Sequence, residues 1–102
     1  MKQPNLESLR QSINDKDREI IRLLNERARI SIQIGEVKGK TGIHVYDPAR
    51  EAIVYNYLQE LNSGPLPQEG VKAIFREIIS ASRDLQKPTT IAFLGPEASF
   101  PI

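Results

Sequence analysis

The sequence predicts an all-α domain of three helices, and three observations lead to that prediction. Apolar residues recur at helical spacing from Leu6 to Val37. No proline interrupts the chain between Pro4 and Pro48. Two later prolines, Pro48 and Pro67, stand where a helix would begin. The predicted order is a long helix, a shorter helix and a helix of medium length.

The first predicted helix covers about residues 5–39, a rod of roughly 50 Å at 1.5 Å per residue. Asn5 is the expected N-cap, and Gly39 and Gly42 are the candidate stops. A compact domain of this size has a radius of gyration of only about 13 Å. We therefore expect a second copy of the chain to cover the apolar positions of this helix, which are Leu6, Leu9, Ile13, Ile20, Leu23, Leu24, Ile30, Ile34 and Val37.

The second helix is predicted over residues 48–61, because Asp47 can cap free amides and Pro48 suits the first helical position. The turn-forming residues 62–65 end it. A third helix is predicted from residue 67 to about residue 86. Its expected buried stripe consists of Val71, Ile74, Phe75, Ile78, Ile79 and Leu85.

The pattern changes after residue 87. Residues 89–94 (TTIAFL) are β-branched and aromatic, and the turn-like GPEASF follows them. This pattern predicts the first strand of a different unit. We therefore divide the chain into a domain at 1–87 and a segment at 88–102, which we expect to be poorly ordered alone or paired with a neighbour.

Composition excludes several classes of function. Fourteen basic against thirteen acidic residues give no overall charge for binding nucleic acid or an anionic membrane. No apolar run approaches the roughly 20 residues of a membrane span, and we expect a cytoplasmic location. The absence of cysteine and the single His44 argue against disulfides, metal sites and nucleophile–histidine dyads. Arginine, lysine and hydrogen-bonding side chains remain, and we expect no metal and no cofactor.

Two cations on the first helix are candidates for binding an anion. Arg27 falls on the apolar seam, and Lys38 lies eleven residues on, close to three full turns, so both face roughly the same way. Their side chains could bracket a compact dianion across about 16 Å. Alternatively they extend into solvent or pair with Glu26 or Glu51. Arg10 lies roughly 25 Å from Arg27 along the same rigid helix, so it is either a surface charge or a residue that reaches a partner's site.

Polar residues on the other two helices add to the candidate site. Ser82 and Gln86 are four residues apart and extend the buried stripe of the third helix. They either line a polar pocket or mark a helix end that emerges into water. Asp47, Arg50 and Glu51 share the first turn of the second helix, where capping alone explains Asp47.

The order and spacing of five elements over about residues 5–86 resemble the all-α AroQ class of chorismate mutases. The elements are Leu9-Arg10 with Ile13, Glu26-Arg27, Gly35 with Lys38, Asp47-Pro48-Ala49-Arg50-Glu51, and Ile78-Ile79 with Ser82 and Gln86. The resemblance implies an intertwined helical homodimer that converts chorismate to prephenate by a Claisen rearrangement. That reaction needs no acid, base or metal, which fits a chain poor in histidine and cysteine.

The resemblance also implies residue roles. Arg27, and Arg10 from the other protomer, would grip the two carboxylates of chorismate. Lys38 and Gln86 would donate to the ether oxygen, where negative charge builds. Because an amide donates at any ordinary pH, we expect activity to persist through neutral pH.

Three residues at the start of the second helix and one of the third would complete the site. By the resemblance, Asp47 and Glu51 would position the ring hydroxyl, and Arg50 and Ser82 would complete the carboxylate environment. Two other functions stay open on the sequence: a non-catalytic helical dimerisation or regulatory module of a larger enzyme, and an isochorismate pyruvate lyase of the same fold.

The segment at 88–102 carries a second family resemblance. Residues 91–97 (IAFLGPE) with Ser99 and Phe100 resemble the opening strand and loop of prephenate dehydratase, the domain that follows the mutase in the bifunctional P-protein of phenylalanine synthesis. Pro101 departs from the polar continuation expected there. We therefore expect residues 88–102 to be a linker and the truncated start of a dehydratase-like domain.

Overall fold

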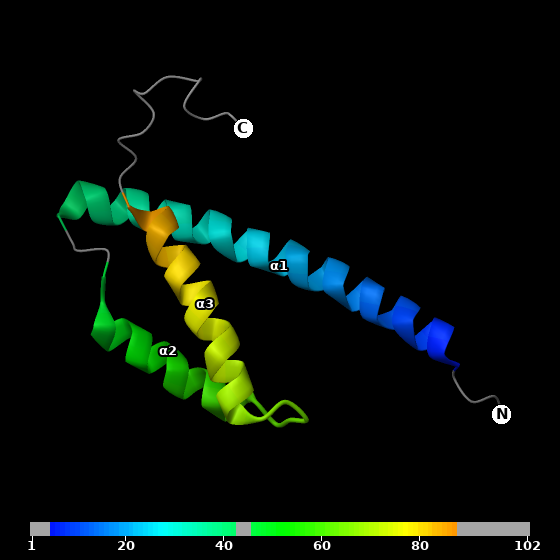
Figure 1. Cartoon of the computed structure of the whole chain (residues 1–102). Helices are drawn as coiled ribbons and strands as arrows, with labels where there is room; N and C mark the ends of the chain where they lie inside the picture. The colour runs from blue at the N-terminus through cyan, green and yellow to red at the C-terminus, as the bar shows by residue number, and fades with distance from the viewer. Residues whose placement is uncertain (1–4, 43–45, 88–102) are drawn as a thin grey trace, which may run out of the picture.

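In a computed structural model of the chain, which describes residues 5–42 and 46–87, three α-helices follow one another (Figure 1). They are α1 (Leu6–Thr41), α2 (Pro48–Leu61) and α3 (Gln68–Gln86), and the described residues contain no strand. The all-α class and the long, short, medium order are confirmed. His44 and the predicted strand and dehydratase-like segment within 88–102 lie outside the described residues.

The ends of α1 show how local side chains set its length. Asn5 caps the start as predicted, since its side-chain oxygen accepts a hydrogen bond from the Ser8 amide at 2.7 Å. The helix continues through Gly39, two residues beyond the predicted end, and stops at Gly42. Gly42 adopts the left-handed backbone with φ 76°, and its amide donates to the Lys38 carbonyl. Gly39 as a stop was wrong, because a glycine within a helix lowers its stability without ending it.

Helices α2 and α3 begin at or within one residue of the predicted positions, and a turn joins them. The Asp47 carboxylate accepts a hydrogen bond from the Arg50 amide at 3.1 Å, and Pro48 fills the first turn of α2. The Asn62 side chain organises the turn after α2, because it accepts from the Gly64 amide at 3.1 Å and donates to the Leu66 carbonyl at 2.9 Å. The third helix begins at residue 68, one residue later than predicted.

Helix α3 connects the other two helices. It packs against α1 on one side and α2 on the other, whereas no Cα atoms of α1 and α2 lie within 8 Å of each other. Figure 1 shows α3 crossing α1 near the C-terminal end of α1, while the N-terminal half of α1 projects beyond the other helices. The radius of gyration is accordingly 18.2 Å, against about 13 Å for a compact domain of this length.

A single copy buries little apolar surface. Among the described residues, Ile79 is the one buried hydrophobic side chain. In the predicted stripe of α3, Val71, Phe75 and Ile78 are half-buried, but Ile74 and Leu85 are exposed, so the prediction of burial was wrong for these two in a single copy. Helix α3 contacts α1 only at their crossing, which leaves part of the stripe uncovered.

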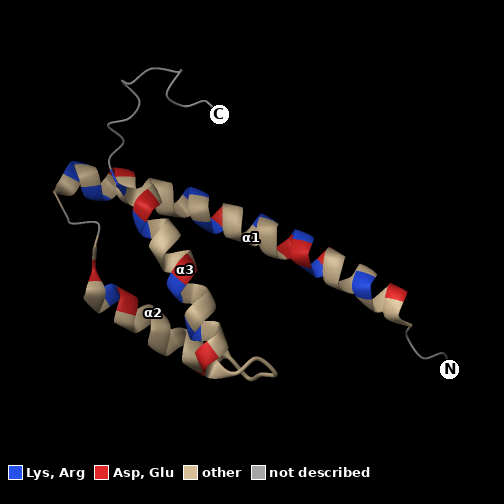
Figure 2. Cartoon of the chain, viewed as in Figure 1, with Lys and Arg blue, Asp and Glu red and all other residues tan. Residues whose placement is uncertain are grey.

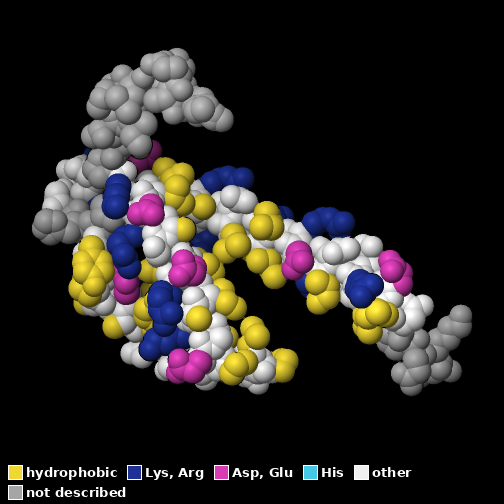
Figure 3. All heavy atoms as spheres, in the orientation of Figure 1, with side chains coloured by type: hydrophobic (Ala, Val, Ile, Leu, Met, Phe, Trp, Pro, Cys, Tyr) yellow, Lys and Arg dark blue, Asp and Glu magenta, His cyan; other side chains and the backbone are white. Residues whose placement is uncertain are grey.

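The apolar seam of α1 also faces outward in a single copy. Figure 3 shows hydrophobic side chains along the edge of α1 nearest the α2–α3 pair. The hydrophobic side chains of α1 that are at least half exposed are Leu6, Leu9, Ile13, Ile20, Ile21, Leu23, Ile30 and Val37. Basic and acidic residues are interspersed along the same helix (Figure 2). None of the helices within the described residues combines the length and the low charge that a membrane span requires.

The crossing of α1 and α3 depends on a glycine. A Cβ atom placed on Gly35 would lie 2.5 Å from the backbone oxygen of Gln86 and 2.6 Å from its Cα, which is closer than real atoms approach. Gly35 is buried in this contact. Because the opposing atoms belong to the backbone, no side-chain rotation could make room for a larger residue. The last turn of α3 therefore sits directly on α1 only because position 35 has no side chain.

We expect Gly35→Ala to destabilise the fold by about 1–3 kcal/mol, because the end of α3 must move away from α1. Gly39→Ala is the matched control, since no atom lies within 4 Å of a Cβ there. That substitution should stabilise the helix by about 0.5–1 kcal/mol. Urea unfolding at a fixed protein concentration measures both changes, and equal stabilisation by the two alanines would contradict the close-contact argument.

Candidate functional site

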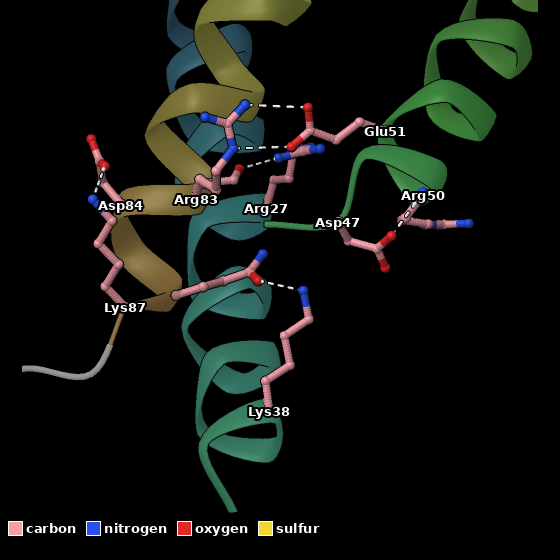
Figure 4. A network of polar contacts seen from close by, with 10 residues as sticks. Arg27, Lys38, Asp47, Arg50, Glu51, Arg83, Asp84 and Lys87 are labelled. Atoms are coloured by element: carbon pink, nitrogen blue, oxygen red, sulfur yellow. Dashed lines mark hydrogen bonds and ion pairs between the residues drawn. The ribbon is translucent and has the colours of Figure 1, made fainter. Parts of the chain in front are cut away.

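The three helices enclose a half-open cavity of about 360 Å³, which is within the size range of small-molecule sites. It lies between the C-terminal half of α1, the start of α2 and the C-terminal half of α3 (Figure 4). Seven of the eight residues predicted from the sequence line this cavity: Arg27, Lys38, Asp47, Arg50, Glu51, Ser82 and Gln86.

Arg27 contacts α3 rather than solvent. Its guanidinium donates a short hydrogen bond to the Ser82 hydroxyl, and Ser82 is buried. Glu26, the alternative partner considered for Arg27, pairs with Arg22 at 2.7 Å. The inward orientation of Arg27 is therefore the one that the fold adopts, and Ser82 belongs to a polar pocket rather than to a helix end in water.

Lys38 and Gln86 form the second contact between α1 and α3. The Lys38 ammonium donates to the side-chain oxygen of Gln86 at 2.9 Å, and both residues are half-buried. An amide that accepts through its oxygen still has an NH₂ group with two donors. Lysine and glutamine are thus close enough for both to reach one atom of a bound molecule.

The start of α2 forms the opposite wall. The Asp47 carboxylate lines the cavity and also caps α2, so the capping explanation for this residue is confirmed as one of its interactions. Glu51 lies one turn further on and its side chain is 20% exposed. Arg50 lines the cavity but is exposed, and in Figure 4 its side chain extends away from Arg27 and Lys38.

Arg83 is a cavity residue that sequence reasoning missed. Its Nε and Nη2 atoms donate to the two carboxylate oxygens of Glu51 at 3.0 and 3.2 Å. Its guanidinium carbon also lies 5.0 Å from the ring centre of Tyr46, a cation–π distance. The hydrogen bonds with Glu51 raise the pKa of Arg83, so the guanidinium stays charged at any ordinary pH. The one sequence signal was the position of this arginine directly after Ser82.

Arg10 is the predicted residue that this cavity does not include. It lies near the N-terminal end of α1 and is exposed. Seventeen residues of straight helix separate it from Arg27, which corresponds to about 25 Å. Within one copy of the chain, Arg10 therefore cannot serve the cavity.

The charges of the cavity suit a small anion. Four cations line it, Arg27, Lys38, Arg50 and Arg83, against the two carboxylates of Asp47 and Glu51. Within residues 5–42 and 46–87, no three His, Cys, Asp or Glu side chains are grouped as a metal site requires. Fold and cavity together define an all-helical protein with a small cavity in which positive side chains outnumber negative ones.

Comparisons with known proteins agree with this class. The family model described as chorismate mutase type II matches residues 9–87. A bifunctional chorismate mutase/prephenate dehydratase from Neisseria gonorrhoeae is 50% identical over 91 residues, which are 89% of this chain and 25% of that protein. A chorismate mutase from Methanocaldococcus jannaschii is 32% identical over 84 residues, 80% of this chain and 84% of that protein.

A solved structure extends the likeness to three dimensions. A chorismate mutase from Thermus thermophilus (form II) superimposes with a TM-score of 0.78 at 41% sequence identity, over 79% of this chain and 92% of that one. The chain belongs to the chorismate mutase type II family. It spans about a quarter of the length of the bifunctional relatives that it matches.

Proposed function

We propose that residues 5–87 catalyse the rearrangement of chorismate to prephenate. The observation that supports this most strongly is the convergence of Arg27 with Ser82 and of Lys38 with Gln86 in one cavity. In the reaction the ether C–O bond breaks as a C–C bond forms within the same molecule, and no proton enters or leaves. Acceleration therefore comes from holding the substrate folded and from stabilising negative charge on the ether oxygen.

Arg27 binds one substrate carboxylate in this proposal, with Ser82 beside it. A guanidinium presents paired N–H donors that match the two oxygens of a carboxylate. Lys38 and the NH₂ group of Gln86 donate to the ether oxygen, which becomes more negative in the transition state. Their 2.9 Å contact supports this role, because it brings both side chains to the same region of the cavity.

The α2 wall orients the remaining polar groups of the substrate. Asp47 and Glu51 accept a hydrogen bond from the ring hydroxyl, and Arg50 at the rim of the cavity adds positive charge near the second carboxylate. The exposed position of Arg50 supports a role at the entrance rather than at the reacting atoms.

We further propose that the domain is an intertwined homodimer in which Arg10 of each protomer reaches the partner's cavity. Two features support it. The apolar side chains of α1 are exposed in a single copy, which one chain cannot cover by itself. The cavity of a single copy also lacks the eighth predicted residue, and the projecting end of α1 carries it.

The proposed activity is tested by mixing the purified protein with chorismate and following the loss of the substrate's ultraviolet absorbance. Formation of prephenate supports it. An intact, folded dimer that leaves chorismate unchanged contradicts it and favours a non-catalytic helical module. Release of salicylate from isochorismate, with chorismate untouched, would instead identify a pyruvate lyase.

Replacing Lys38 with alanine should lower kcat by about 10²–10³-fold, as removal of one donor to a developing oxyanion does in other enzymes. Lys40→Ala is the matched control, because Lys40 lies two residues away on α1 and does not line this cavity. Steady-state kinetics on both variants measure the effect. A Lys38→Ala enzyme with nearly normal kcat would remove Lys38 from the role proposed.

Activity should persist through neutral pH, since the Gln86 amide donates without needing a proton from solution. Gln86→Glu should confine activity to acid, because a glutamate donates a hydrogen bond only when its carboxyl group is protonated. The measurement is kcat against pH from about 4 to 9 for both proteins. Superimposable profiles would mean that position 86 does not donate to the substrate.

Mixing two inactive variants tests whether Arg10 acts across the dimer. Arg10→Ala and Arg27→Ala should each lose most activity, because each removes one guanidinium from every site. After the two are unfolded and refolded together at equal amounts, mixed dimers should contain one intact site, and about a quarter of wild-type activity should return. No recovery, despite mixed dimers seen by native mass spectrometry, would place both arginines in the same protomer's site or exclude Arg10.

A further inference from the structure

Arg83 and Glu51 form an ion pair at the cavity. The pair joins α3 to α2 at the wall of the cavity, and both residues line it. Nε of Arg83 donates to one carboxylate oxygen of Glu51 and Nη2 donates to the other (Figure 4). The Arg83 side chain is 35% exposed. The pair is therefore partly shielded from water and open toward the space where a ligand would lie.

The Glu51 carboxylate would be unfavourable for a dianion if it stood alone. A negative charge a few ångströms from a bound carboxylate opposes binding, and partial burial strengthens that repulsion relative to water. A bidentate guanidinium partner cancels this charge and also fixes the direction in which the carboxylate oxygens point. Arg83 is in position to do both, because its Nε and Nη2 atoms lie 3.0 and 3.2 Å from the two Glu51 oxygens.

We propose that Arg83 is a positioning residue for substrate binding. It neutralises the charge of Glu51 and holds the Glu51 carboxylate toward the cavity. That carboxylate can then accept a hydrogen bond from the substrate without repelling the dianion. This inference rests on the proposed function and assigns a role to a residue outside the predicted set. Tyr46 supports the arrangement, since its ring lies 5.0 Å from the guanidinium carbon. The role is distinct from a clamp between helices, because it depends on the charge of Glu51.

The proposal predicts a separation of KM from kcat. Arg83→Met should raise KM for chorismate about tenfold, because Glu51 is left as an unpaired negative charge, while kcat changes less than about threefold. Adding Glu51→Gln to that variant should lower KM again by at least about threefold, since the glutamine keeps an acceptor oxygen but has no charge. Arg76→Met is the matched control: it removes one positive charge from α3 outside the cavity, and KM should not change.

A second variant separates charge from folding. Arg83→Gln keeps N–H donors for Glu51 but loses the charge, so KM should rise about tenfold in this variant too. It tests the proposal by itself where the methionine variant does not fold. Thermal unfolding and dimer content are measured for every variant. Unchanged KM in folded Arg83→Gln, or a raised KM in Arg83→Met that Glu51→Gln does not reverse, would overturn the proposal. Failure of the wild-type protein to convert chorismate would overturn the proposed function instead.

Discussion

The close approach of α3 to α1 at Gly35 is the contact on which the rest of the site depends. The backbone of Gln86 rests where the side chain of any larger residue at position 35 would be. This brings the last turn of α3 down onto α1 and places the Gln86 amide 2.9 Å from the Lys38 ammonium. Ser82 lies one turn earlier on the same face, so the same crossing also sets its hydrogen bond with Arg27.

Helix α3 thereby packs against both α1 and α2. Its inward face meets α1 through Ser82 and Gln86. Arg83, the residue after Ser82, turns toward α2 and binds Glu51. Helices α1 and α2 do not approach each other directly, so the cavity is the space that α3 leaves between them. A small shift of α3 would therefore change the size of the cavity, because α3 is the helix that holds α1 and α2 in place.

The same arrangement leaves a single copy with little interior. One buried hydrophobic residue among those described is far below what a stable domain of this size requires, and the exposed apolar side chains of α1 extend well past its crossing with α3. Apolar surface of this extent is typical of helices that pack against a second chain. The proposed dimer would therefore provide both the missing core and, through Arg10, the missing part of the site.

The sequence by itself determined the local features. Asn5, Asp47 and Gly42 end or begin helices through contacts with residues three or four positions away, and such contacts are readable from short patterns. Seven of the eight site residues were predicted from helical spacing together with the family resemblance, and they line one cavity. Local reasoning failed at Gly39, where nothing nearby ends the helix, and at Ile74 and Leu85, whose burial depends on which helices lie opposite.

Only the tertiary structure decided that Gly35 is a contact point and that Arg83 meets Glu51, 32 residues away in the chain. Such pairings follow from the angle and distance at which helices cross, and no periodicity within one helix encodes them.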